Sequence, residues 1–138
     1  MGTQIDTRIE SMATLFQALG DPTRLRIIGL LLGGEVCVCD IHETLRITQP
    51  KASRHLAYLR RAGVVEARRE GLWVHYRLAE TDDAVLDAVR QAVAHALGHL
   101  KSIRQDGQRL QKESGCCAPV LTRTPVFACC AREGKPAS

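Results

Sequence analysis

Six cysteines are the side chains of this 138-residue chain best suited to chemistry, and they form one C-x-C pair and two adjacent pairs. The pairs are Cys37 with Cys39, Cys116 with Cys117, and Cys129 with Cys130. Neighbouring Cα atoms lie about 3.8 Å apart, closer than the roughly 4.4–6.8 Å of a relaxed disulfide, so we do not expect a bridge within an adjacent pair. The spacing favours ligands for a thiophilic ion, or redox-active thiols, over a disulfide framework.

The expected compartment supports this interpretation. No apolar run approaches the ~18–20 residues of a membrane span, and the N-terminus lacks the basic-then-apolar plan of a signal peptide. We therefore expect a cytoplasmic protein with no membrane partner. Thiols stay reduced in that compartment.

Cys37 and Cys39 fall at the start of a short helix predicted over residues 38–45. Unpaired backbone N–H groups and the helix dipole favour thiolate over thiol there. Residues two apart point to opposite sides of a regular helix, so we expect the two sulfurs to share an ion only if the first turn distorts. Three thiolates suit trivalent arsenic or antimony, whereas two thiolates and an imidazole suit zinc or cadmium.

We expect the C-terminal tail to supply further sulfurs to this pair. Helical periodicity fades beyond Gly107, and prolines among polar residues predict a mobile segment that can fold back. The expected ligands are Cys37, Cys39, Cys116 and Cys117, followed by the weaker candidates His42, Cys129 and Cys130. The alternatives are that the tail cysteines have no role and that Cys37 and Cys39 are small buried apolar residues.

Basic residues are concentrated in the middle of the chain. Lys and Arg number 19 against 15 Asp and Glu, a net charge of +4 that by itself identifies no partner. Residues 46–77 hold eight basic and two acidic side chains, a local net of +6, whereas residues 1–45 and 78–100 are each −3. This distribution is typical of a surface that binds phosphates.

Apolar periodicity and capping residues predict four helices before residue 63. Ile5, Ile9, Met12, Phe16 and Leu19 share one face of the first helix, which Gly20 ends. Asp21-Pro22 begins the second helix, and Gly33-Gly34 stops it. The third helix spans residues 38–45, and Thr48 caps a fourth that runs to Ala62.

The period changes after Gly63. Val64–Arg69 and Leu72–Leu78 are strand-like and joined by a tight turn, which predicts a β-hairpin. Thr81 is expected to cap one long last helix. The chain is therefore predicted to be mainly α with a small β-hairpin, with a folded domain over residues 1–106 and a Cys-containing tail over 107–138.

The fourth helix has the geometry of a DNA-reading element. At 100° per residue, Ala52, Leu56 and Leu59 cluster on one side, and the opposite side carries small groups and arginines. The expected DNA contacts are Gln49, Lys51, Ser53, Arg54 and Arg60 on this helix, with Arg68 and Arg69 at the hairpin tip. His55 is better explained as a packed structural residue than as a base contact. The order short helix, turn, helix, basic hairpin is that of a winged helix-turn-helix.

Four segments in order resemble the ArsR/SmtB metalloregulator family: 21–26 (DPTRLR), 35–40 (EVCVCD), 48–56 (TQPKASRHL) and 71–78 (GLWVHYRL). The resemblance covers residues 10–105. It implies a homodimeric repressor in which the first and last helices pair with their symmetry mates. Inducer binding then releases an inverted-repeat operator in double-stranded DNA.

The resemblance also points to the inducer. Arsenite-sensing members carry C-x-C-x-x-C, and the third position of that motif is His42 in this chain. Trivalent arsenic is the expected inducer, with antimonite and methylarsenite as variants and no organic cofactor. Zinc, cadmium or thiol oxidation are the alternative signals. A thiol enzyme is not expected, because the chain has no Cys-x-x-Cys and no glycine-rich phosphate loop.

Overall fold

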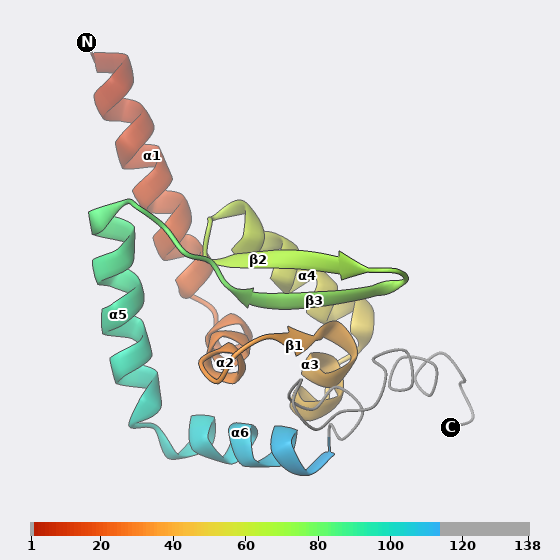
Figure 1. The fold of residues 1–138 in the computed structure, drawn as a ribbon. Coiled ribbons are helices and arrows are strands. Elements are labelled where there is room, and N and C mark those ends of the chain that lie inside the picture. The colour runs from red at the N-terminus through yellow and green to blue at the C-terminus, as the bar shows by residue number, and fades with distance from the viewer. Residues whose placement is uncertain (1, 114–138) are drawn as a thin grey trace.

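Six helices and a three-stranded antiparallel sheet make up residues 2–113, the part of the chain that the computed structural model describes (Figure 1). The elements are α1 (Gly2–Leu19), α2 (Pro22–Leu31), β1 (Val36–Cys37), α3 (Val38–Leu45), α4 (Gln49–Arg61), β2 (Val65–Glu70), β3 (Trp73–Leu78), α5 (Ala84–Gly98) and α6 (Lys101–Glu113). The predicted fold class is confirmed. No helix in this range is long and apolar enough to cross a bilayer.

Side-chain caps fix where the central helices begin, as the sequence predicted. The Asp21 carboxylate accepts a hydrogen bond from the Arg24 backbone N–H at 3.0 Å, and the Thr48 hydroxyl accepts one from Lys51 N–H at 3.3 Å. Both caps precede a proline in the first turn, where the missing N–H costs nothing. α3 ends at Arg46, which adopts a left-handed conformation (φ 59°, ψ 44°). These boundaries set the turn between α3 and α4.

The core joins the three central helices to the sheet. Its least exposed large hydrophobic side chains come from α2, α3, α4 and the residue just before β2. They are Ile27, Ile41, Leu56, Leu59 and Val64. Burying each such side chain contributes about 1.5–3 kcal/mol to folding, so α3 is held firmly against α4.

The hairpin of β2 and β3, here called the wing (residues 65–78), projects beyond the helices (Figure 1). β3 is the central strand, since the sheet order is β1-β3-β2. The short strand β1, which the sequence did not predict, pairs Cys37 with His75. On the other side of β3, Arg68 pairs with the same His75. The chain segment that carries Cys37 is therefore part of the wing sheet.

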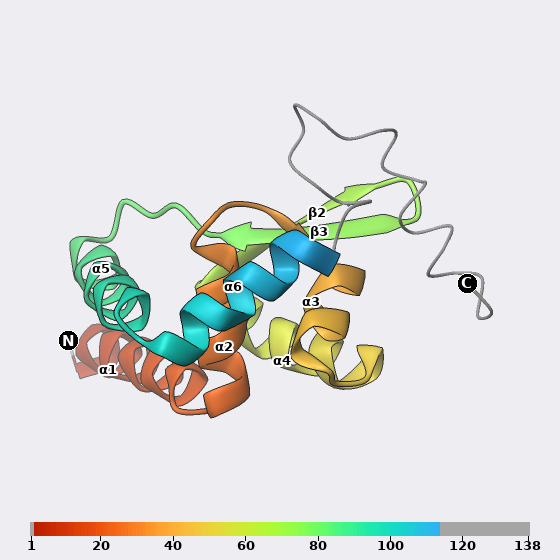
Figure 2. The same ribbon diagram turned by 90° about the horizontal axis from the view of Figure 1, so that it is seen from below.

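The expected single last helix is wrong, because the chain turns after Gly98 and forms α5 and α6. The expected cap is also wrong: Asp83, not Thr81, accepts the first N–H groups of α5, from Val85 at 2.9 Å and Leu86 at 3.2 Å. Thr81 instead accepts a hydrogen bond from Asp83 N–H. The turn lets α6 run across α2 to α3 (Figure 2).

α6 packs closely on α2 and extends past residue 107, where the sequence placed the start of the tail. A Cβ built on Gly29 of α2 would lie 2.7 Å from a methyl carbon of Ile103, so only glycine fits beneath α6. The helix continues to Glu113. Residues 114–138 lie outside the described part of the chain.

α1 leaves part of its apolar face uncovered. Leu15 and Ala18 are buried, but Ile9, Met12 and Phe16 are 60%, 42% and 52% exposed. These three residues, here called the α1 stripe, lie one helical turn or two apart on one face.

Candidate thiol site and nucleic-acid interface

Cys37 and Cys39 form a thiol pair at the start of α3, with their sulfurs 3.0 Å apart. Both side chains are buried, at 1% and 3% exposure. Cys37 is the N-cap residue and has an extended backbone (φ −72°, ψ 146°), so it lies outside the helix that contains Cys39. The expectation that the sulfurs meet only if the first turn distorts is therefore wrong. The extended N-cap brings them together without disturbing the helix.

Among residues 2–113, no other expected ligand lies with the two cysteines. Within that range no group of three or more His, Cys, Asp or Glu side chains is arranged to hold a metal ion. The His42 ring nitrogen Nδ1 lies 3.3 Å from the Ile47 carbonyl oxygen, at the other end of α3. Cys116, Cys117, Cys129 and Cys130 lie outside the described residues.

His75 is a neighbour of the thiol pair that the sequence analysis did not identify as functional. It pairs with Cys37 across β1 and β3, and its side chain is 6% exposed. Its Nε2 has no hydrogen-bond partner among the described residues and lies 3.7 Å from a Glu70 carboxylate oxygen. The alternation of His75 with Val74 and Tyr76 would have placed it on the Cys37 face, had β1 been recognised.

Arg68 reaches across the sheet beside His75. Its Nε and Nη2 donate to the two carboxylate oxygens of Glu35 at 3.0 and 2.6 Å, and its Nη1 donates to Glu70 at 3.2 Å. The Arg68 hydrogen bond holds the pKa of Glu35 below its usual value, and the same contact raises the pKa of Arg68. Arg68 was expected to contact DNA; in this state two carboxylates of its own chain hold its guanidinium.

The exposed face of α4 carries the residues predicted to read DNA. Ala52, Leu56 and Leu59 are buried, as predicted. All five expected contacts on this helix are exposed: Gln49, Lys51, Ser53, Arg54 and Arg60. Arg69 is exposed near the tip of the wing, where its Nη1 lies 3.5 Å from the Gly71 carbonyl oxygen. Basic groups thus line both a helix and the adjacent hairpin.

His55 lies on the flank of α4 and contacts residues of the preceding helices. Its Nδ1 is 3.3 Å from the Arg24 guanidinium and 3.8 Å from the Asp21 carboxylate. Burial lowers the pKa of His55, since it disfavours the charged ring. Arg24 in turn donates to the Ala18 and Gln17 carbonyl oxygens at the end of α1. These contacts support the interpretation of His55 as a structural residue.

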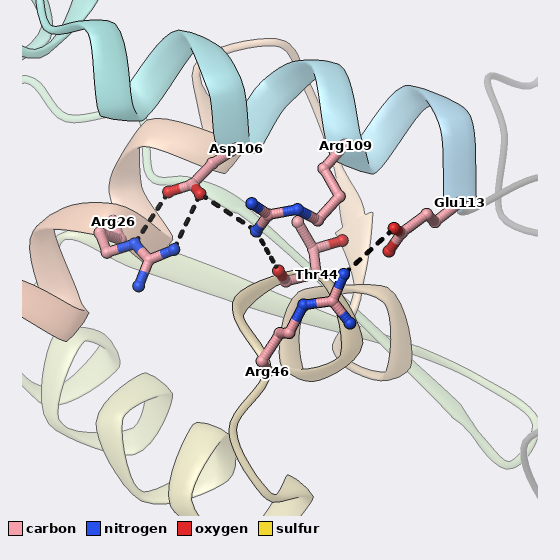
Figure 3. Close-up of polar contacts among 6 residues, drawn as sticks. All are labelled: Arg26, Thr44, Arg46, Asp106, Arg109 and Glu113. Carbon is pink, nitrogen blue, oxygen red and sulfur yellow. Dashed lines mark hydrogen bonds and ion pairs between the residues drawn. The ribbon is translucent and has the colours of Figure 1, made fainter.

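α6 is tied to α2 and α3 by a group of charged side chains (Figure 3). Asp106, 3% exposed, accepts two hydrogen bonds from Arg26 of α2 at 2.9 and 2.8 Å. Arg109 lies 3.5 Å from the same carboxylate and donates to the Thr44 carbonyl oxygen of α3 at 2.9 Å. Nothing in the periodicity predicted these contacts, because they join residues 65 and 80 positions apart.

The end of α6 lies next to the end of α3. Glu113, the last described residue, has its carboxylate 3.5 Å from the Arg46 guanidinium (Figure 3). Arg46 is the C-cap of α3. The chain that leaves α6 toward residue 114 therefore starts beside the helix that carries Cys39.

Comparison with known proteins agrees with this architecture. The family model described as "Bacterial regulatory protein, arsR family" matches residues 21–67, from the N-cap of α2 into β2. The homodimeric winged helix-turn-helix DNA-binding domain of a possible ArsR-family regulator from Mycobacterium bovis has a similar structure, with a TM-score of 0.58 and 36% identity. That match covers 71% of this chain and 92% of the other.

Sequence relatives include named resistance regulators. The arsenic resistance transcriptional regulator ArsR2 of Pseudomonas putida is 39% identical over 112 residues, covering 75% of this chain and 95% of that protein. The arsenical resistance operon repressor of Escherichia coli is 54% identical over 66 residues, 47% of this chain and 56% of that one. A cadmium resistance regulatory protein CadC homologue of Staphylococcus aureus is 37% identical over 97 residues, with 70% and 75% coverage.

A winged helix-turn-helix with an exposed basic helix and a projecting hairpin defines a DNA-binding transcriptional regulator rather than an enzyme. The chain belongs to the ArsR family of bacterial regulatory proteins. The resemblance drawn from the four sequence segments is confirmed.

Proposed function

We propose that this chain is a cytoplasmic homodimeric repressor that trivalent arsenic releases from an inverted-repeat operator by binding Cys37 and Cys39. The observation that carries the proposal is the buried thiol pair, with sulfurs 3.0 Å apart, at the start of a helix packed on the DNA-reading helix. N–H groups at that helix start favour the thiolate form that a soft ion needs.

The separation of the sulfurs favours a pyramidal trivalent centre over zinc. Tetrahedral zinc with Zn–S bonds of about 2.3 Å would hold two sulfurs about 3.8 Å apart, wider than the observed 3.0 Å. A trivalent centre with a lone pair closes the angle between its bonds, so it requires a smaller displacement of the sulfurs. Arsenite, antimonite and methylarsenite share this geometry.

We propose Cys116 or Cys117 as the source of the third sulfur. Glu113 is held beside Arg46 at the end of α3, and Cys116 follows three residues later. Three residues span at most about 11 Å, and the eight residues of α3 are about 12 Å long. By chain length alone, Cys116 and Cys117 can cover most of the distance back along α3 toward Cys37, whereas Cys129 and Cys130 are farther along the chain.

In this proposal, binding of the ion pulls a third sulfur toward the start of α3 and displaces that helix, which releases the operator. α3 packs directly on α4, so a displaced α3 moves the face that carries Arg54 and Lys51. A coupling free energy of about 1–3 kcal/mol per site would weaken operator binding by about 5- to 150-fold. In this proposal Arg54 grips a guanine edge, Gln49 and Ser53 bond bases or phosphates, and Lys51, Arg60 and Arg69 bind phosphates.

The dimer is proposed from the α1 stripe together with α5. Ile9, Met12 and Phe16 form an exposed apolar face on α1, and Val85 of α5 is also exposed. A second copy would bury these side chains across a two-fold axis. The similar domain from Mycobacterium bovis is homodimeric, which supports a dimer.

Thiol oxidation is the second candidate signal, because two sulfurs 3.0 Å apart need only a short approach to form a disulfide. An oxidant such as a peroxide would take the two electrons, and the thiols would release two protons. Anaerobic, reducing conditions separate the two candidates, since only an ion-responsive repressor is then released.

The test is an arsenite titration of the operator complex under those conditions. We expect Cys37→Ser and Cys39→Ser to keep operator affinity and lose release, and Cys116→Ser/Cys117→Ser to require much more arsenite. Cys129→Ser/Cys130→Ser is the matched control and should behave as the wild type. Unchanged release in the Cys37 and Cys39 variants would overturn the site assignment.

A further inference from the structure

The thiol pair and the wing share one row of the sheet. Cys37, His75 and Arg68 are direct cross-strand partners on β1, β3 and β2. Directly opposed residues point to the same face of a sheet, and so do residues two apart on a strand. Glu70, two residues after Arg68 on β2, therefore belongs to this face as well, and Glu35, the residue before β1, reaches it through its contact with Arg68.

Arg68 joins the two outer strands of this sheet across the central one. It leaves β2, passes β3 and holds both carboxylate oxygens of Glu35 next to β1, at 3.0 and 2.6 Å. Planar two-point contacts between a guanidinium and a carboxylate fix direction as well as distance. The second link to Glu70 extends the contact toward the tip of the wing.

Another ion pair of the wing does not have this reach. Arg77 and Glu66 form an ion pair at 2.8 Å, but it joins only β3 and β2. β1 itself is two residues long and pairs with β3 at two positions only. The Glu35–Arg68 contact is thus a substantial part of what holds the outer wing strand to the segment that carries Cys37.

We propose that the Glu35–Arg68 contact couples the thiol pair to the wing, so that an ion bound at Cys37 and Cys39 moves the wing as well as α4. Glu35 is a positioning residue in this scheme. An ion that displaces Cys37 displaces β1 and Glu35 with it, and Arg68 is drawn along or released. This inference rests on the proposed function, because it takes the thiol pair as the inducer site.

Trp73 provides a direct readout of the wing. It is the only tryptophan in the 138-residue chain, and it lies on β3 opposite Glu70, at the tip end of the hairpin. Its fluorescence therefore reports on wing motion without any added label. The thiol pair itself contains no fluorophore that would interfere.

The experiment compares the full-length wild type with Glu35→Gln and with the matched control Glu66→Gln. Both variants remove one carboxylate from a wing arginine, but only Glu35 lies beside the thiol pair. For each protein, Trp73 emission and anisotropy are measured during an arsenite titration, and operator affinity is measured with and without arsenite. The ratio of the two affinities removes any uniform effect of the lost charge.

We expect Glu35→Gln to lower Trp73 anisotropy without ligand, to reduce its response to arsenite, and to shrink the affinity ratio by about 2- to 30-fold. Glu66→Gln should retain the wild-type response and ratio. Equal behaviour of the two variants would overturn the coupling while leaving the proposed function intact. If arsenite instead failed to release the wild type from its operator, the proposed function would fail. Even then, a Trp73 response to arsenite that is present in the wild type and lost only in Glu35→Gln would support the coupling between the thiol pair and the wing.

Discussion

Cys37 is the N-cap of α3 but does not use its side chain as a cap. Its side chain makes no capping hydrogen bond to a backbone N–H of α3, unlike the carboxylate and hydroxyl that cap α2 and α4, and its sulfur lies 3.0 Å from that of Cys39 instead. The extended backbone at the cap directs the sulfur toward Cys39, and the dipole at the start of a helix favours a negative charge. Because its sulfur is not used to cap the helix, Cys37 is suited to bind a soft ion.

The two kinds of basic residue on α4 should be separable by mutation. We expect Arg54→Ala to weaken operator binding by about 1–3 kcal/mol and to relax base preference at one position, because an arginine can read a guanine edge. Lys51→Ala should weaken binding to all sequences alike and reduce the dependence on salt. Binding measured against operator variants at several salt concentrations checks both. Equal loss on specific and nonspecific DNA in Arg54→Ala would contradict its assignment.

His55 should make folding stability depend on pH. Burial holds its pKa in the folded protein below the unfolded value of about 6.5. Above that value both states are neutral, and as the pH falls toward the folded pKa the unfolded chain takes up a proton that the folded protein resists. We expect denaturation between about pH 7.5 and about pH 5.5 to show a steeper loss of stability in the wild type than in His55→Gln. Parallel curves would show that His55 contributes nothing.

At the scale of elements, α6 fastens α2 to α3 through Asp106. Asp106→Asn removes the charge that Arg26 and Arg109 share, and we expect a loss of about 2–3 kcal/mol in the free energy of unfolding. Urea denaturation measures this loss. Glu113→Gln, which weakens an exposed contact with Arg46, serves as the control and should change stability by less than about 0.5 kcal/mol. Similar values for the two variants would mean that the buried carboxylate has no special role.

The sequence predicted best those helices and strands whose ends are marked by capping residues, prolines or a change in apolar periodicity. Asp21-Pro22 and Thr48 place the starts of α2 and α4, and the change to alternating residues after Gly63 places the wing. The break between α5 and α6 was not predicted, because apolar residues continue at helical spacing across it to Ile103. Beyond the break, Ile103 packs on Gly29 of α2, a contact between distant residues that apolar spacing does not reveal.

Among the described residues, both members of the thiol pair were named from the sequence, but their geometry was misjudged. The C-x-C spacing identified Cys37 and Cys39. Because both were assumed to lie in a regular helix, their sulfurs were expected on opposite sides of it. Their convergence depends on Cys37 entering a strand with His75, which is 38 residues away. The contact between Arg68 and Glu35 was not predicted for the same reason, because the two residues are distant in sequence and adjacent only across the sheet.

At the scale of the whole molecule, the α1 stripe should decide the oligomeric state. We expect Met12→Glu/Phe16→Glu to sediment as a monomer and to lose most operator affinity, because one half-site alone forms fewer contacts. Leu72→Glu is the matched control, since Leu72 is an exposed apolar residue in the turn of the wing, away from the stripe. A dimer that survives the double change would place the interface elsewhere.

The order of the sheet also bears on how this protein stays in solution. β2 is an outer strand, and the backbone groups on its free side could pair with a strand of another molecule. Four of its six residues are charged: Glu66, Arg68, Arg69 and Glu70. Charged side chains on an edge strand oppose edge-to-edge pairing and fibril growth, so the charges of β2 keep neighbouring copies of the protein from adding a strand to the wing.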